Sequence, residues 1–321
     1  MRIFITRKIL NHGIDMLTSA GHEITISPHD RVLTPPELID GGKDQDAVLT
    51  QLTDKVTLEV LEAWKGSVKI VANYAVGYDN VDVAAAKELG ITISNTPDVL
   101  TETVAEHTFA LMLAIAHRVA EADKFMRAGK YIGWEPELLL GTDLSHKTLG
   151  IVGLGRIGSR VAHHGAKGFD MRVLYYDVKR NGDFEKEVGA EFRAAPEDIF
   201  KEADFVSIHV PLLPTTHHLV NAERLRLMKP TAYLVNTSRG PIVDEKALAE
   251  ALRDKIIRGA AIDVFENEPA MEPMLKDLDN IIVTPHIASA TEETRQKMGE
   301  VAAKNILEVL AGNPAPNAIH I

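Results

Sequence analysis

The 321-residue sequence is long enough for about two domains, and its 45% content of hydrophobic residues is enough for a large buried core. The net charge of −11, without a Lys/Arg-rich block, argues against nucleic acid or an anionic membrane surface as a partner. Cysteine is absent, which excludes disulfides, thiolate catalysis and cysteine-ligated zinc, and no apolar run reaches the length of a membrane span. Because the first apolar run, residues 1–6, is too short for a signal peptide, we expect a soluble cytoplasmic protein.

The first hundred residues alternate between short apolar runs and segments with helical spacing. Strands are predicted at residues 2–6, 23–27, 46–50, 69–73 and 91–94, and helices at residues 11–20, from 35, 54–64 and 81–89. Such alternation is typical of a parallel sheet that helices cover on both faces, with right-handed crossovers between strands.

A long helix is predicted from about Leu100 to Ala128. Its apolar residues cover most of the circumference, so we expect it to be buried between domains or subunits, and a dimer interface is its expected role. These residues include Val104, Phe109, Leu111, Leu113, Ile115 and Val119. The irregular segment that follows, residues 129–143, contains Trp134.

A second alternating segment begins near residue 149. Its predicted strands are 149–152, 171–176, 205–209, 233–236, 259–262 and 281–284, and its helices are 156–167, 183–188, 196–201, 221–227 and 244–253. Because this domain is then complete, the last predicted helix, residues 292–310, should return to the first one. We predict an α/β protein with two doubly wound parallel sheets: a discontinuous domain at 1–97 and 287–321, and a dinucleotide domain at 98–286. Substrate and cofactor would meet in a cleft between them.

Three glycines follow the first strand of the second domain in the pattern Gly153-x-Gly155-x-x-Gly158. The first allows a sharp turn, the second lets a pyrophosphate approach the backbone, and the third lets the helix pack closely on the strand. The helix N-terminus then faces the phosphates. Asp177 lies about 20 residues further on, where a carboxylate binds the adenosine ribose. The sequence therefore predicts a dinucleotide site.

Three polar residues follow later strands of this domain: Arg239, Glu268 and His286. Each alone is more often a surface or structural residue. Because the carboxyl ends of parallel strands share one edge, we expect the three to lie together there. A guanidinium can hold a carboxylate, and a histidine oriented by a glutamate can transfer a proton. This set suits the reduction of a 2-keto acid.

At these residues the chain resembles the D-2-hydroxyacid dehydrogenase family, and within it the glyoxylate/hydroxypyruvate reductase branch. The resemblance covers essentially the whole chain, and the fingerprint glycines belong to it. The other segments that carry it are Asn73–Asn80, Asn95–Leu100, Asn236–Gly240, Asp263–Pro269 and Thr284–Ile287. It implies a flavodoxin-like substrate domain beside a Rossmann domain for NAD.

The resemblance also implies roles for single residues. Arg239 would bind the substrate carboxylate and polarise its carbonyl, Glu268 would orient His286, and His286 would donate the proton during reduction. Further substrate contacts are implied at Val76, Gly77 and Ser289, and from Trp134 of a Trp-x-Pro loop that reaches the partner subunit. Cofactor contacts are implied at Gly153, Leu154, Gly155, Arg156, Ile157, Gly158, Asp177, Val210, Pro211, Thr237, Asp263 and Thr103.

The charge of Asp177 would repel a 2′-phosphate, so NAD(H) is expected over NADP(H), although Lys179 and Arg180 soften this preference. No metal is expected, because no His-Glu-x-x-His spacing occurs; His217-His218 is interpreted as a polar loop. Two alternatives stay open: a 3-phosphoglycerate dehydrogenase without the regulatory domain, and an NAD-sensing scaffold similar to the corepressors that share the fold. Formate dehydrogenase is less favoured, because that branch carries Gln-His in place of Glu and Pro-His. The expected assembly is a homodimer.

Overall fold

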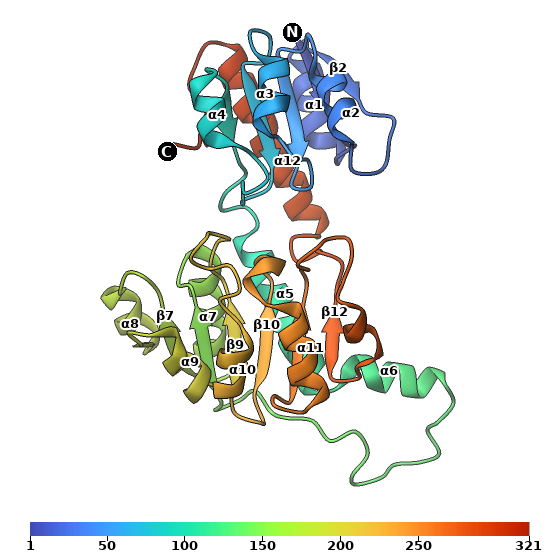
Figure 1. Ribbon diagram of the computed structural model, residues 1–321, viewed down its shortest axis with the longest axis vertical. Helices are drawn as coiled ribbons and strands as arrows, with labels where there is room; N and C mark the ends of the chain where they lie inside the picture. The colour runs from blue at the N-terminus through green and yellow to red at the C-terminus, as the bar shows by residue number, and fades with distance from the viewer. Residues whose placement is uncertain (321) are drawn as a thin grey trace. The chain divides into compact units, whose positions relative to one another are not determined.

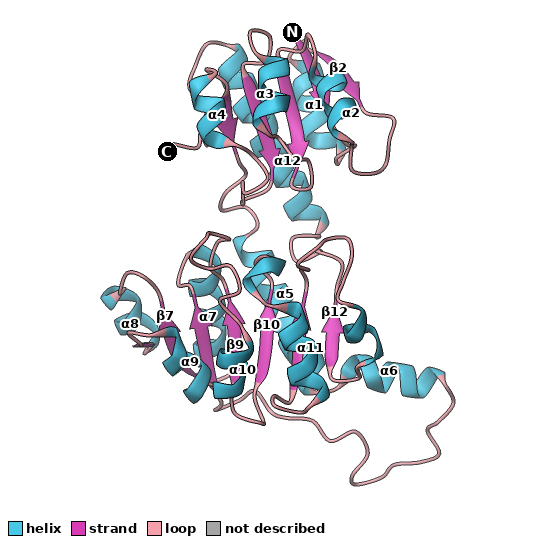
Figure 2. Ribbon diagram, in the orientation of Figure 1, coloured by secondary structure: helices cyan, strands magenta, loops and turns pink. Residues whose placement is uncertain are grey.

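The structure is a computed structural model that describes residues 1–320 and divides the chain into two compact units. The first unit contains Met1–Leu100 and the C-terminal segment from Ser289, and the second contains Thr101–Ala288. Each unit has one parallel sheet with helices around it (Figures 1 and 2). None of the described helices is long and apolar enough to cross a membrane.

The first unit contains five parallel strands in the order β2-β1-β3-β4-β5, which is the flavodoxin order. The strands are β1 (Arg2–Ile5), β2 (Glu23–Ile26), β3 (Ala47–Gln51), β4 (Ile70–Tyr74) and β5 (Thr92–Ser94). The helices are α1 (Asn11–Ser19), α2 (Pro35–Gly42), α3 (Leu58–Trp64), α4 (Val83–Glu88) and α12 (Glu292–Leu310). One face of this sheet packs on α2, α3 and α4 around the fully buried Trp64.

The last helix, α12, belongs to the first unit. Helix α12 packs against α1 so closely that a Cβ on Gly13 would lie 2.5 Å from the carbonyl oxygen of Gly299. Tyr74, at the end of β4, donates its hydroxyl to the carbonyl of Arg295 in the first turns of the same helix. These contacts hold the segment from Ser289 beside the carboxyl ends of the first sheet.

The second unit contains seven parallel strands in the order β12-β11-β10-β9-β6-β7-β8. The order reverses between β9 and β6, which is the Rossmann switch point. The strands are β6 (Thr148–Val152), β7 (Arg172–Tyr176), β8 (Glu191–Phe192), β9 (Phe205–Ile208), β10 (Tyr233–Asn236), β11 (Gly259–Ile262) and β12 (Ile281–Val283). The helices are α5 (Thr101–Ala116), α6 (Val119–Arg127), α7 (Arg156–Gly168), α8 (Gly182–Val188), α9 (Pro196–Glu202), α10 (Ala222–Leu227) and α11 (Glu245–Arg253).

Alternate residues of this sheet face two separate cores. Val206 and Ile208 face the core under α9, α10 and α11, whereas Phe205 faces the core under α5 and α7. Fully burying a side chain of this size contributes roughly 1.5–3 kcal/mol, so both cores hold the strand ends in place. The two-residue strand β8 was not predicted, because so short a run carries no periodic signal.

The predicted long helix is wrong in one respect: it is two helices. Helix α5 ends at Ala116, and Arg118 has φ +55°, a left-handed conformation that breaks the helix before α6. The backbone N–H of Thr142 donates to the carbonyl of Ala116 at 2.9 Å, so the returning chain satisfies the broken end.

Only the first part of this stretch is buried, and it is buried in the core of the second unit and not, as expected, between domains or subunits. Helix α5 contains eight buried residues, but α6 contains none, and Val119 is 53% exposed. We call α6 and residues 128–143 the arm, which runs away from the sheet of the second unit (Figure 1). Its exposed large side chains are Val119, Met126, Tyr131, Ile132, Trp134 and Leu140.

Candidate active site

The glycine turn has the geometry that a pyrophosphate requires. Gly153 follows β6 with φ +99°, and a Cβ on Gly158 would lie 2.0 Å from the carbonyl oxygen of Gly153. A Cβ on Gly155 would meet no atom within 4 Å, so this position is open in front of the N-terminus of α7. Replacing the first or third glycine would distort the turn, and the second leaves room for a ligand.

Asp177 lies beside this turn, at the end of β7. Its Oδ2 accepts a hydrogen bond from the backbone N–H of Leu154 at 2.7 Å, and its Oδ1 accepts one from the backbone N–H of Lys179 at 3.1 Å. The carboxylate is therefore fixed against the glycine turn. On the other side, a Cβ on Gly153 would lie 2.8 Å from the backbone of His209 and Val210. The loops after β6, β7 and β9 thus meet, and together they fit a dinucleotide.

His286 and Glu268 are in direct contact. The ring Nδ1 of His286 lies 3.0 Å from Oε2 and 3.2 Å from Oε1 of Glu268, and both side chains are about one-quarter exposed. Burial raises the pKa of Glu268, but the hydrogen bond and charge of His286, the N–H of Phe265 and the charge of Arg239 outweigh it, so the pKa is lowered. Glu268 is therefore held as an anion that orients the imidazole.

Asp263 fixes the turn that carries His286. Its carboxylate is fully buried and accepts hydrogen bonds from the hydroxyl of Thr284 at 2.6 Å and from the backbone N–H groups of Ile287 and Ala288 at 2.9 and 2.7 Å. The backbone N–H of His286 donates to the carbonyl of Asp263, and His286 itself has φ +55°. Burial raises the pKa of Asp263, but its hydrogen bonds together lower it. Asp263 thus lies beneath the site as an anion.

Two residues of α5 that the sequence did not single out reach these strand ends. The ring Nε2 of His107 lies 3.4 Å from the Thr284 hydroxyl and 3.6 Å from Oδ1 of Asp263. The hydroxyls of Thr108 and Thr237 are 3.0 Å apart and buried, so the side chain of Thr237 faces α5. A contact between segments that are distant in the chain leaves no periodic signal in a single sequence. The only signal for these two contacts was the presence of polar residues on an otherwise apolar helix.

Arg239 is held by the loop after β10. The side chain of Asn236 donates to the carbonyl of Arg239 at 3.0 Å, and the guanidinium donates to the carbonyl of Ser238 at 2.8 Å. A Cβ on Gly240 would lie 1.9 Å from the carbonyl of Phe265, so the Arg239 loop and the Glu268 loop are in direct contact. The charge of Arg239 accordingly lowers the pKa of Glu268.

The remaining predicted residues lie elsewhere. In the first unit, the carbonyls of Val76 and Gly77 accept hydrogen bonds from the side chains of Asn95 and Asn73, at 2.7 and 2.9 Å. Ser289 is half-buried just before α12. In the second unit, Thr103 is half-buried in the first turn of α5, Ile157 is half-buried in α7, and Arg156 and Pro211 are exposed. Trp134 is 81% exposed on the arm.

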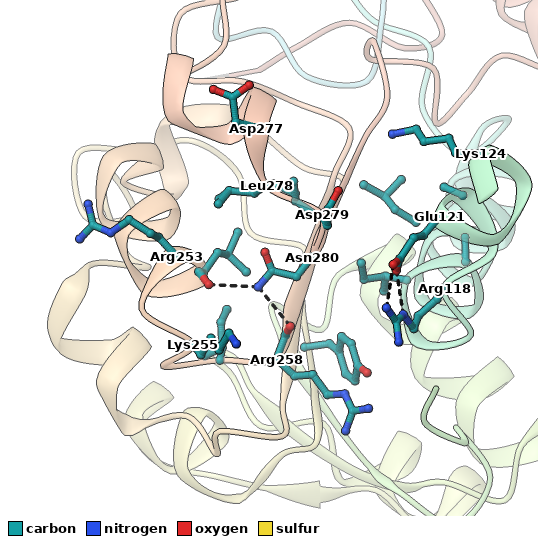
Figure 3. A pocket seen from close by; sticks show the side chains of 18 of the residues that line it. Arg118, Glu121, Lys124, Arg253, Lys255, Arg258, Asp277, Leu278, Asp279 and Asn280 are labelled. Carbon is teal, nitrogen blue, oxygen red and sulfur yellow. Dashed lines mark hydrogen bonds and ion pairs between the residues drawn. The ribbon is translucent and has the colours of Figure 1, made fainter. Parts of the chain in front are cut away.

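A hollow of about 750 Å³ lies at the opposite edge of the second sheet (Figure 3). It is lined near the starts of β10, β11 and β12, where Tyr233, Arg258 and Ile281 lie. Ligands of open α/β sheets bind at the carboxyl ends of strands, so this hollow is separate from the Arg239, Glu268 and His286 group. Its basic side chains are partly neutralised within it, as Arg118 pairs with Glu121 at 2.7 Å.

A Rossmann sheet with a glycine turn, and an Arg, a Glu and a His at its carboxyl edge, are the features of a nucleotide-dependent oxidoreductase. Residues 109–288 match the family model for the NAD binding domain of D-isomer specific 2-hydroxyacid dehydrogenases. The chain belongs to this family, which confirms the resemblance and the fold class predicted from the sequence.

Similar proteins cover the whole chain. A glyoxylate reductase of Pyrococcus furiosus is 47% identical over 99% of this chain and 95% of its own length. The crystal structure of the TT0316 protein from Thermus thermophilus has a TM-score of 0.93 and 42% identity, covering 100% of both chains. An NADPH-dependent glyoxylate/hydroxypyruvate reductase of Sinorhizobium meliloti, solved with NADP and malonate, has a TM-score of 0.86 and 30% identity, covering 99% of this chain and 96% of its own.

Proposed function

We propose that the protein reduces glyoxylate or hydroxypyruvate to the 2-hydroxy acid with a reduced nicotinamide cofactor. The observation that carries the proposal is the His286–Glu268 pair, in which Nδ1 and Oε2 are 3.0 Å apart. The loop that carries Glu268 also touches the Arg239 loop at the carboxyl edge of the nucleotide unit. The names of the similar reductases support the substrate class. No feature of the site favours a phosphorylated substrate or a binding role without catalysis.

The bound cofactor supplies a hydride for the keto carbon. Arg239 binds the substrate carboxylate and stabilises the negative charge that develops on the carbonyl oxygen. His286, protonated beforehand, gives its proton to that oxygen, while Glu268 accepts from Nδ1 and so fixes which nitrogen faces the substrate. Asp263 keeps the His286 turn in place, because its carboxylate accepts hydrogen bonds from the backbone N–H groups of Ile287 and Ala288.

We assign the nucleotide to the second unit and part of substrate binding to the first. Val76 and Gly77 would offer backbone N–H groups to the substrate carboxylate, because asparagine side chains already hold their carbonyls. The hydroxyl of Ser289 would form a further contact with the substrate. The cofactor would be bound by the glycine turn and by residues at the neighbouring strand ends and the start of α5. These are Gly153 to Gly158, Thr103, Asp177, Val210, Pro211 and the backbone of Thr237.

NAD(H) is the proposed preferred cofactor, with NADP(H) as the alternative. The fixed carboxylate of Asp177 would repel a 2′-phosphate, and its position against Leu154 leaves it little freedom to turn away. The Sinorhizobium meliloti reductase is NADPH-dependent, so the preference of this chain is a question for direct measurement.

We also propose a homodimer built on the arm. Six large apolar side chains of the arm are exposed, Ile132 by 91% and Trp134 by 81%. A cluster of this kind is typical of a surface that a partner covers, and a second copy of the chain would bring Trp134 near the partner's substrate. The cytoplasmic location stays a prediction from the sequence.

The direct test is an assay of NADH oxidation with a panel of 2-keto acids at equal concentration. We expect glyoxylate and hydroxypyruvate to give the highest kcat/KM, and pyruvate and 3-phosphohydroxypyruvate to give lower values. Binding of NADH without oxidation by any acid in the panel would favour the scaffold alternative instead.

A further inference from the structure

The structure brings together one set of metal-ligating side chains outside the proposed active site. His217 and His218 lie in the loop between β9 and α10, and Glu266 lies in the loop after β11. The candidate ligand atoms of these three residues all lie within 4.8 Å of one another. Within residues 1–320, no other group of three histidine or carboxylate side chains converges in this way.

The ring of His218 contacts both other members of this group. The ring Nε2 of His218 lies 2.7 Å from Oε1 of Glu266, and the rings of His217 and His218 are 4.1 Å apart, tilted by 31°. Two imidazoles and a carboxylate are the ligand set of many zinc sites, with each ligand atom roughly 2.0–2.2 Å from the ion. His217 is exposed, whereas His218 and Glu266 are half-buried.

A second glutamate, Glu245, fixes the loop that carries Glu266. The Oε2 of Glu266 accepts a hydrogen bond from the backbone N–H of Glu245 at 3.4 Å, and the N–H of Glu266 donates to the buried carboxylate of Glu245. The side chain of Glu245 also accepts a hydrogen bond from the backbone N–H of Glu272 at 2.9 Å, so it ties together two points of the loop that carries Glu266. The Glu266 carboxylate is thus oriented from behind, as ligands of bound metals usually are.

The loops that meet at this point carry the proposed catalytic residues. His218 has φ +49°, and its backbone N–H donates to the carbonyl of Pro241 at 2.9 Å, in the segment after Arg239. Glu266 precedes Glu268 by two residues. An ion at this point would join the loop after β9 to the loop after β11, and none of its three ligands is His286.

We propose that His217, His218 and Glu266 form a binding site for one divalent transition-metal ion of the zinc class, which clamps these loops together. The site leaves the remaining coordination positions to water. Its role is to stabilise the folded second unit, since an ion that binds only the native state raises the free energy of unfolding. The inference does not depend on the substrate or on the reductase activity.

A second histidine pair in the chain provides a matched control. His163 and His164 are also adjacent, and each approaches a glutamate, at 3.6 Å for His163 with Glu187 and 2.8 Å for His164 with Glu102. Their ring centroids are 6.1 Å apart and their glutamates differ, so the four side chains do not converge. A His163→Ala variant removes a histidine of the same kind without affecting the proposed site.

The test is isothermal titration of the untagged protein with ZnCl2, followed by visible absorption spectra with CoCl2. We expect one Zn²⁺ per chain, at least a tenfold weaker affinity in His217→Ala, and wild-type affinity in His163→Ala. Cobalt bands should appear in the wild type and His163→Ala but not in His217→Ala. The proposal is overturned by the absence of saturable binding, by equal affinity in His217→Ala, or by an equal loss in His163→Ala. Because His217 is exposed, its replacement leaves the fold intact, which circular dichroism verifies.

Discussion

Gly240 lies directly against Phe265: a Cβ at Gly240 would lie 1.9 Å from the carbonyl carbon and oxygen of Phe265 and 2.5 Å from the nitrogen of Glu266. This contact brings the loop that carries Arg239 onto the loop that carries Glu268. The distance between the side chains of Arg239 and Glu268 therefore depends on Gly240, which has no side chain of its own.

Replacing Gly240 with Ala should force these two loops apart. We expect the free energy of unfolding to fall by about 1–3 kcal/mol, as in other overpacked positions, and kcat to fall because Arg239 moves. Urea unfolding and steady-state kinetics measure the two effects. Gly182→Ala is the control, because a Cβ there meets no atom within 4 Å. Equal losses in the two variants would show that the contact does not hold the loops.

His107 should act as a positioning residue. Its ring lies near Thr284 and Asp263, which fix the His286 turn, so His107→Ala should lower kcat about tenfold, or about 1.4 kcal/mol of transition-state stabilisation. NADH affinity, measured by fluorescence titration, should change little. His107→Gln keeps an N–H donor and should recover part of the loss; a Gln variant as slow as the Ala variant would contradict this role.

Asp177 should set the cofactor preference. We expect the wild type to have a higher kcat/KM with NADH than with NADPH, and Asp177→Ser to lower that ratio by at least tenfold, because the repelling charge is removed. Asp183→Ser is the control, since it removes an exposed carboxylate from the neighbouring helix α8. A wild type that prefers NADPH would overturn the assignment.

His209 should make stability depend on pH. Burial lowers its pKa to about 3, and its Nε2 is 2.7 Å from the Ser207 hydroxyl. In the unfolded chain the pKa is about 6.5, so as pH falls below that value the unfolded state binds a proton that the native state does not. Stability from this group is present above about pH 6.5 and is lost as pH falls toward 3.

The expected loss of unfolding free energy is at most about 1.4 kcal/mol per pH unit, because a single proton distinguishes the unfolded from the native state at this group. Urea unfolding between pH 7 and pH 4 should show a smaller pH slope in His209→Asn than in the wild type. His12→Asn, on the exposed face of α1, should keep the wild-type slope. An unchanged slope in His209→Asn would contradict the prediction.

The sequence predicted most of what depends on local pattern. Apolar runs located every strand of the two sheets except β8, and the glycine spacing located the turn after β6, because period and glycine position are local properties. The break at Arg118 was missed, since an arginine gives no signal for a left-handed conformation. Asp54, expected to begin a helix, is instead buried and bound to Thr6, a contact between residues distant in sequence.

For the candidate active site, too, the sequence predicted local features but not contacts between distant segments. Arg239, Glu268 and His286 could be predicted because each follows a strand and parallel strands end at one edge. His107 and Thr108 could not, because they come from a helix whose packing on that edge is set by the whole core. The convergence of His217, His218 and Glu266 likewise depends on how two loops cross.

The most direct test of the account is glyoxylate reduction by a His286→Ala variant, with NADH binding measured in parallel. We expect turnover to fall by about a thousandfold while the Kd for NADH stays within about threefold of the wild type, because general acid catalysis contributes roughly 10²–10⁴-fold and the ring is not needed to hold the nucleotide. Turnover within about tenfold of the wild type, with the variant folded, would contradict the assignment of His286 as the proton donor.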